Sequence, residues 1–124
     1  MKILVGVTDV AVLADAFEIE GREIPERYQS YELNEWDEYA LEAAVQLVEA
    51  DLADEVVTLT IGPERTEETI RKGLAKGADR ARRIWSPGLA ERQLLDSALK
   101  ARLLGAGIEA EAPDLVLTGV QTGD

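Results

Sequence analysis

The stretch Ile3-Leu4-Val5-Gly6-Val7 is an uninterrupted apolar run that ends in the polar pair Thr8-Asp9. A strand with one face in water alternates apolar and polar residues, whereas a strand covered on both faces does not. The run therefore predicts a central strand of a parallel sheet, followed by a polar turn. The weaker pattern of residues 14–32 predicts either a small hairpin around Glu20-Gly21-Arg22 or an irregular excursion.

Three further stretches predict strands. Val56-Val57-Thr58-Leu59-Thr60-Ile61 is β-branched and apolar, and it closes on Gly62-Pro63, a dipeptide that suits a turn into a helix. The stretch Ala81-Arg82-Arg83-Ile84-Trp85 carries two adjacent arginines that cannot both be buried, so we expect it at a sheet edge. A short final strand is predicted at Leu115 to Leu117.

Helices are predicted between these strands. The first should begin at Asn34, whose side chain can cap exposed amides, with acidic residues in its first turn, and should run to about Ala50. Its apolar stripe recurs at helical spacing and consists of Ala40, Leu41, Ala44, Val45, Leu47 and Val48.

The second predicted helix should turn Ile70, Leu74 and Ala75 inward and stop at Gly77. A third should end at Gly105 or Gly107, with an apolar face made of Leu94, Leu95, Ala98, Leu99, Leu103 and Ala106.

This alternation predicts one α/β domain over residues 1–124, a doubly wound parallel sheet with right-handed crossovers and helices on both faces. The apolar first strand suits the centre and the arginine strand suits an edge, so the expected strand order is 3-2-1-4. Winding then reverses between strands 1 and 4, where ligands gather beyond the carboxyl ends. The loops at that point are Gly6 to Asp9 and Gly119 to Asp124.

Cysteine and histidine are both absent from the 124 residues. Their absence excludes disulfides, thiolate nucleophiles, imidazole or thiolate metal ligands, and catalytic triads that need histidine. Asp37 and Glu38 are adjacent, so on a helix they splay apart and form no acid–base dyad. What remains is carboxylate or lysine chemistry, or a binding role in which a cofactor carries the reactive chemistry. We expect no metal site and no catalytic residues.

The chain has 25 acidic and 13 basic residues, a net charge of −12, and only four lysines. This balance argues against a nucleic-acid partner. It is typical either of an acidic surface that maintains solubility or of a halophile's adaptation to high salt. Neither a long apolar segment nor a signal peptide is visible, so we expect no membrane insertion and a cytoplasmic protein.

Several side chains have two plausible uses. Asn34 and Asp37 can cap a helix, contact a ligand, or do both. Trp36 and Trp85 can stack on a ring system, although a core or interface position is the commoner use of tryptophan. Three arginines around the edge strand can bind a phosphate or form surface ion pairs, of which the ion pairs are favoured; they are Arg80, Arg82 and Arg83.

Several motifs occur in a fixed order along the chain. They are Lys2-Ile-Leu-Val-Gly-Val7, Leu33-Asn-Glu-Trp-Asp-Glu38, Gly62-Pro63 with Glu68-Thr-Ile-Arg71, Gly73-Leu-Ala-Lys-Gly-Ala-Asp-Arg80, and Asp114-Leu-Val-Leu-Thr-Gly119 with Gln121. Together these motifs make the chain resemble the beta subunit of an electron-transfer flavoprotein. The resemblance covers the whole chain but only the amino-terminal half of that family's usual length. We therefore expect a truncated chain or a domain whose site needs a continuation or a partner.

The resemblance implies the three-layer α/β/α fold of adenine nucleotide alpha hydrolase-like domains. It also implies a heterodimer with an alpha subunit, in which FAD carries electrons from acyl-CoA or other flavin dehydrogenases to a quinone-linked acceptor. The beta subunit would bind AMP or a second FAD, and would not be catalytic alone.

The same resemblance implies a set of nucleotide-binding residues, although these 124 residues do not contain the Asn-Gln-Thr-Gly phosphate loop of the family. They are Gly6, Asn34, Glu35, Trp36, Asp37, Ile61, Gly119, Val120, Gln121, Thr122, Gly123 and Asp124. Independently of the family, Gly6 and Gly119 lack a Cβ atom, so a flat base or a sugar can approach two neighbouring strand ends.

Two other functions fit parts of the sequence. A free-standing adenine-nucleotide-binding module of the universal-stress-protein type shares the strand order, but its late Gly-x2-Gly-x9-Gly-Ser/Thr run has no match here. An adenylating enzyme would need a phosphate loop, a basic cluster or a histidine, and none is found.

Overall fold

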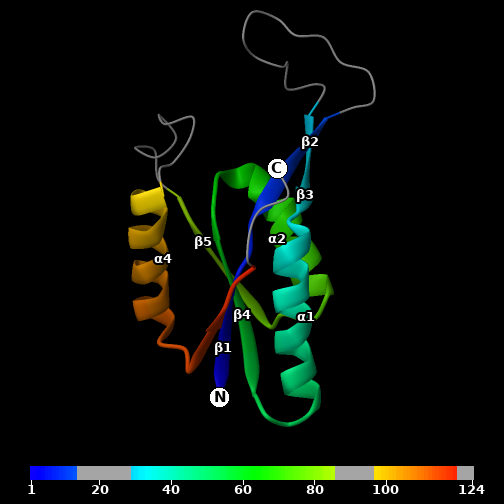
Figure 1. The fold of residues 1–124 in the computed structure, drawn as a ribbon, viewed down its shortest axis with the longest axis vertical. Coiled ribbons are helices and arrows are strands. Elements are labelled where there is room, and N and C mark those ends of the chain that lie inside the picture. Colours follow the sequence, from blue (N-terminus) through cyan, green and yellow to red (C-terminus); the bar gives the residue numbers. More distant parts are fainter. Residues whose placement is uncertain (14–28, 86–96, 120–124) are drawn as a thin grey trace, which may run out of the picture.

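Four parallel strands form the central sheet in the part of the chain that the computed structural model describes, residues 1–13, 29–85 and 97–119 (Figure 1). They lie in the order β5-β4-β1-β6. Their bounds are β1 (Lys2–Gly6), β4 (Glu55–Ile61), β5 (Arg80–Ile84) and β6 (Leu115–Leu117). If only these four strands are counted along the chain, the order is 3-2-1-4, so the predicted strand order is confirmed.

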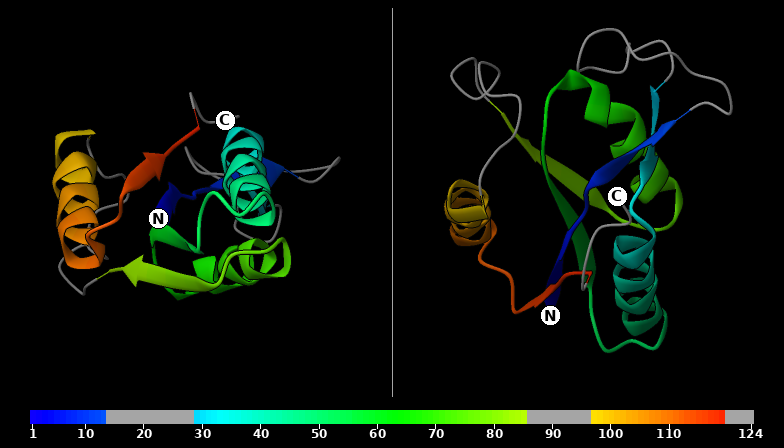
Figure 2. Two further views of the ribbon diagram at one scale, coloured as in Figure 1. Left: turned by 90° about the horizontal axis from the view of Figure 1, so that it is seen from below. Right: turned by 45° about the horizontal axis from the view of Figure 1, so that its top comes forward.

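Helices cover both faces of the sheet (Figure 2). The first, α1 (Glu35–Glu49), lies on one face with α2 (Glu67–Ala75), which follows a short 3₁₀ turn, η2 (Glu64–Thr66). The opposite face is covered by α4 (Ser97–Glu111). The three-layer α/β/α architecture expected from the sequence is therefore present.

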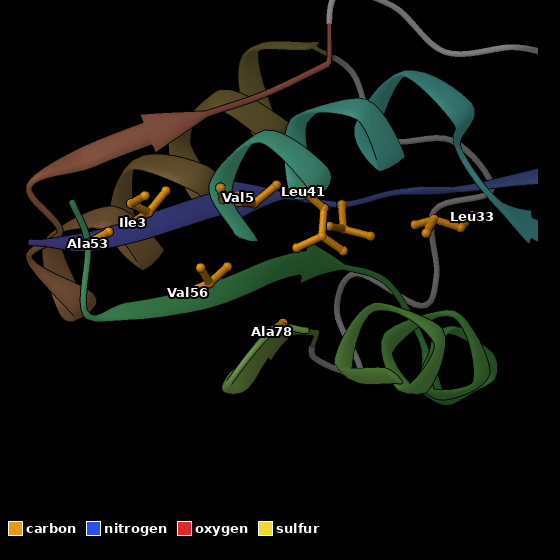
Figure 3. Packing of buried hydrophobic residues seen from close by; sticks show 9 residues of the cluster. Ile3, Val5, Leu33, Leu41, Ala53, Val56 and Ala78 are labelled. Carbon is orange, nitrogen blue, oxygen red and sulfur yellow. The ribbon is translucent and has the colours of Figure 1, made fainter. Parts of the chain in front are cut away.

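The apolar run of β1 is explained by these two layers. Ile3 and Val5 pack into the cluster beneath α1, where Leu41 is also fully buried (Figure 3). Leu4, from the other face of the same strand, packs with Leu59 against the α4 side. Since neither face meets water, no position in the strand favours a polar residue.

A second, two-stranded sheet extends from the end of β1. Its strands β2 (Asp9–Leu13) and β3 (Gln29–Leu33) pair antiparallel. Asp9 thus begins a strand, where the sequence analysis predicted a turn. Antiparallel pairing agrees with the hairpin alternative, although the expected turn at residues 20–22 lies outside the described residues.

The arginine-rich strand β5 lies at one end of the sheet, as predicted. Its arginines form ion pairs and hydrogen bonds with the protein itself. The Arg83 guanidinium donates to the carbonyl oxygen of Gly62 at 3.1 Å and lies 3.8 Å from the carboxylate of Glu67. These contacts agree with the ion-pair interpretation of the arginines.

Glu111, the last residue of α4, is a buried carboxylate that the sequence analysis did not single out. It accepts hydrogen bonds from Arg80 and Arg82, each at 2.9 Å, and Lys2 Nζ lies 3.4 Å away. The two guanidinium groups lower the pKa of Glu111 to about 2. The carboxylate therefore ties α4 to β1 and β5 at the amino ends of the strands.

Replacing Glu111 by glutamine is expected to lower the free energy of unfolding by about 1–2 kcal/mol at pH 7, because Arg80 and Arg82 are half exposed and water can solvate them. The unfolded carboxyl titrates near its ordinary pKa of 4.5, whereas the folded one stays ionised to about 2. The stabilisation is complete above pH 4.5 and is lost as the pH falls toward 2.

Urea unfolding at pH 7, 4 and 2.5 measures the difference in unfolding free energy between the wild type and Glu111→Gln. This difference should shrink toward zero at the lowest pH. The exposed Glu109→Gln, on the same helix, should differ little from the wild type at every pH. A Glu111→Gln deficit that is independent of pH would contradict the assignment.

Two predictions about the inward face of α2 were wrong. Leu74 was expected inward, but it is 38% exposed, and Ala75 is exposed as well. Instead α2 buries Thr69 and Gly73. A Cβ atom on Gly73 would lie 3.7 Å from Thr58 and 3.8 Å from Leu41, so this face of small residues allows the helix backbone to lie close to its neighbours.

The helix α4 does not stop at Gly105 or Gly107 but continues to Glu111. Gly107 is buried against the sheet, where a Cβ atom would come within 2.7 Å of Leu59. Tertiary packing of the helix on the sheet thus outweighs the low helix propensity of glycine. Ala98 and Ala106, expected inward, are exposed, and Leu94 and Leu95 lie outside the described residues.

Candidate functional site

The carboxyl ends of β1 and β6 lie side by side. The two strands pair in parallel, with Val5 opposite Leu117. On the other side of β1, Gly6 lies opposite Leu59 of β4. The chain leaves β1 toward β4 but returns to the opposite side for β6, so this is the switch point of the sheet.

A cleft of about 250 Å³ opens at this switch point. It extends from the strand ends to the first half of α4. Its described lining consists of Gly6, Val7, Thr8, Asn34, Asp37, Leu59, Ile61, Lys100, Leu104, Thr118 and Gly119. The volume is just below the roughly 300–1,000 Å³ of typical small-molecule sites, so it suits a nucleoside-sized group.

Asp37 connects the three segments around the cleft. It lies in the first turn of α1 and is 6% exposed. One carboxylate oxygen accepts hydrogen bonds from the amide and the hydroxyl of Thr8, at 2.9 and 2.7 Å. The other accepts from the amide of Gly119 at 3.2 Å. One side chain therefore holds the ends of β1 and β6 against the start of α1.

Asn34 occupies the N-cap position of α1 but forms no side-chain capping hydrogen bond, so its predicted capping role was wrong. Asn34 is almost fully buried. Its backbone amide donates to the Thr8 carbonyl at 2.9 Å, and its own carbonyl accepts from the amides of Asp37 and Glu38 at 3.0 Å. The backbone thus secures the entry to the helix next to the cleft.

The two glycines at the strand ends differ in what surrounds them. A Cβ atom on Gly119 would lie 2.5 Å from Oδ1 of Asp37 and 2.9 Å from the carbonyl carbon of Trp36. A Cβ atom on Gly6 would meet only Cγ2 of Thr118, at an ordinary 3.5 Å. Close packing on α1 therefore requires glycine at 119, whereas Gly6 borders open space in the cleft.

The structure brings five of the expected binding residues to this cleft. They are Gly6, Asn34, Asp37, Ile61 and Gly119. Glu35 is exposed and Trp36 is half-buried, and neither belongs to the described lining. The remaining candidates, Val120, Gln121, Thr122, Gly123 and Asp124, lie outside the described residues.

The sequence analysis missed several lining residues, among them Leu59, Lys100 and Leu104. Lys100 and Leu104 are four residues apart, a spacing that places them on one face of a helix. That spacing was a usable signal, but only the packing of α4 shows that this face reaches the strand ends.

The cleft combines apolar walls with a few polar groups, as ligand sites generally do. Leu59, Ile61 and Leu104 offer apolar contact to a flat ring, while Thr8 and Asn34 are polar. Among the described residues, no group of three or more acidic side chains is arranged to hold a metal ion. The apolar walls with a few polar groups suit the binding of an organic ligand.

A wider hollow of about 440 Å³ lies beside α1, lined in part by Glu38, Glu42, Glu49 and Lys76. Three carboxylates against one lysine disfavour an anionic ligand there. No strand contributes to its described lining, so the smaller cleft at the switch point is the better candidate.

The strand order and the helical layers define a doubly wound α/β domain, with a candidate ligand cleft at its switch point. A family model described as "Electron transfer flavoprotein domain" matches residues 23–124. This chain belongs to the electron transfer flavoprotein family.

Relatives named "Electron transfer flavoprotein subunit beta" extend the match. The one from Methylophilus methylotrophus is 46% identical over the whole chain, which corresponds to 47% of that relative. The one from Dictyostelium discoideum is 32% identical over the whole chain and 48% of its own length. The human one is 42% identical over 76% of the chain and 36% of its own length. The chain thus spans less than half the length of these relatives.

Proposed function

We propose that this chain is the nucleotide-binding part of an electron-transfer flavoprotein beta subunit and binds AMP, or the adenylate portion of a second FAD, in the cleft between β1 and β6. The observation that carries the proposal is the position of the cleft. It lies at the topological switch point, where parallel α/β sheets bind ligands. Its apolar walls and its volume support a purine and a sugar as occupants.

The residues that line the cleft support an adenine nucleotide as its ligand. Leu59 and Ile61 supply a surface on which a base can lie, and Gly6 leaves room for a sugar. The hydroxyls of Thr8 and Thr118 lie on residues that line the cleft, where they can meet ribose oxygens. The chain would thus bind the nucleotide and keep the ends of β1 and β6 in fixed positions around it.

The wider activity belongs to the heterodimer. We infer an FAD-carrying alpha subunit as the partner, acyl-CoA or other flavin dehydrogenases as electron donors, and a quinone-linked acceptor. Bound flavin supplies the redox chemistry, and the described residues of this chain provide binding and geometry, so the chain is not an enzyme by itself.

We also propose a cytoplasmic location, although one relative, from Oryza sativa subsp. indica, is named as mitochondrial. Throughout the described ranges, every helix is too short or too polar to cross a membrane. Adaptation to high salt stays a prediction from the acidic composition.

Co-expression with an electron-transfer flavoprotein alpha subunit tests this function. The expected product is a yellow complex from which acid releases FAD and about one equivalent of AMP or of a second FAD per heterodimer. A Gly6→Val variant should retain less than a tenth of the nucleotide, because its branched side chain adds bulk beside the cleft while β-branched residues suit a strand.

Gly6→Ala is the matched control, since its Cβ atom meets Thr118 at an ordinary distance and should change the unfolding free energy little. Isolation of the chain without alpha subunit and without nucleotide would contradict the proposal. A nucleotide-bound homodimer that ignores the alpha subunit would favour the stress-protein type instead.

A further inference from the structure

Lys100 brings a positive charge to the cleft. It lies on α4, one turn before Leu104, and both line the cavity at the strand ends. Among the described lining residues it is the only cation, and Asp37 is the only carboxylate. The described lining therefore carries one basic side chain, from α4, and one acidic side chain, from α1.

The other lysines have different surroundings. Lys2 lies 3.4 Å from the Glu111 carboxylate, and Lys76 lies 2.9 Å from that of Glu38. Lys72 is exposed on α2, outside the cleft. Lys100 forms no ion pair with any residue that the structure describes, although the chain carries a net charge of −12. Its ammonium group is free to pair with an anion that enters the cleft.

The acidic side chain of the cleft, Asp37, is already hydrogen-bonded within the protein. The Asp37 oxygens accept three hydrogen bonds from Thr8 and Gly119. They still place negative charge at the strand ends, which repels a phosphate from that part of the cleft. An anionic ligand is therefore best oriented with its neutral part at the β1 and β6 ends and its anionic part toward α4.

We propose that Lys100 binds the phosphate attached to adenosine, and so makes the cleft prefer a nucleotide over a nucleoside. This inference rests on the proposed function, because it requires an adenine ligand in the cleft. AMP and FAD share this adenosine phosphate, so the same contact serves either. An ammonium group pairs with phosphate as a point charge without a fixed geometry, which suits a flexible side chain at a cleft margin.

Calorimetric titration of the nucleotide-free protein with AMP and with adenosine tests this orientation. The wild type should bind AMP about tenfold more tightly than adenosine, and this preference should weaken as salt is added. Lys100→Gln should reduce the preference to about twofold or less, because it weakens the binding of AMP more than that of adenosine. Lys100→Arg should restore most of it, and the matched Lys72→Gln variant should behave as the wild type.

An unchanged preference for AMP in Lys100→Gln, or a wild-type preference insensitive to salt, would overturn the role of Lys100 and leave nucleotide binding intact. Failure of the wild type to bind either AMP or adenosine would instead overturn the proposed function, and this inference with it. Circular dichroism of each variant checks that the exposed substitution has not altered the fold.

Discussion

Replacing Asp37 by alanine is expected to lower the free energy of unfolding by about 2–3 kcal/mol, because three hydrogen bonds to one ionised acceptor are lost and water only partly replaces them. The amides of Thr8 and Gly119 lose their acceptor, so the ends of β1 and β6 are no longer held against α1. Urea unfolding measures the loss. Hydrogen exchange should accelerate at these two amides more than elsewhere in the sheet.

Two further variants separate the loss of the Asp37 hydrogen bonds from the mere loss of a carboxylate on α1. Glu42→Ala removes an exposed carboxylate from the same helix and should stay within about 0.5 kcal/mol of the wild type. Asp37→Asn keeps one oxygen acceptor but presents an NH₂ group to the other donor, so it should fall between the wild type and Asp37→Ala. Unchanged stability and unchanged exchange in Asp37→Ala would refute the structural role of this carboxylate.

A Gly119→Ala substitution is expected to destabilise the protein by about 2–3 kcal/mol through overpacking. The new Cβ atom would lie 2.5 Å from Asp37 Oδ1, 2.9 Å from the Trp36 carbonyl carbon and 3.0 Å from the Asp37 amide nitrogen. Two of these are backbone atoms, which cannot turn aside as a flexible side chain can. The end of β6 must therefore move away from α1 and open the cleft, and thermal unfolding should show the loss.

Gly105→Ala is the natural control for this experiment. Gly105 lies within α4 and a Cβ atom there meets nothing within 4 Å. Alanine should therefore stabilise the protein by about 0.5–1 kcal/mol through helix propensity. If Gly119→Ala proved as stable as the wild type, the close packing of β6 on α1 would be wrong.

Local sequence patterns predicted the sheet well. The apolar runs at Ile3–Val7 and Val56–Ile61 required cover on both faces, and the adjacent Arg82 and Arg83 required an edge. These are constraints on burial within one element, and they depend on residues two to four positions apart. The observed strand order places both apolar runs inside and the arginine strand at an edge, and each of these three strands lies beside its neighbour in the chain.

Local patterns failed where an element had a choice of face. On α2, Leu74 and Thr69 both suit a helix, but the close approach to Thr58 and Leu41 selected the side with Gly73. On α4, glycine predicted a helix end, yet Gly107 serves to bring the helix against Leu59. Which face of a helix is buried depends on the space that neighbouring elements leave for its side chains. The periodicity of the helix's own sequence carries no information about that space.

The candidate site divides in the same way. The sequence by itself determined that Gly6 ends one strand, that Gly119 follows the end of its neighbour, and that a helix begins next to Asn34. These features follow from local burial and charge. Only the tertiary structure decided that Asp37 joins both strand ends and that Lys100 reaches the cleft. The rotation of a helix about its axis and the partner of a buried carboxylate are set by contacts between residues far apart in the chain.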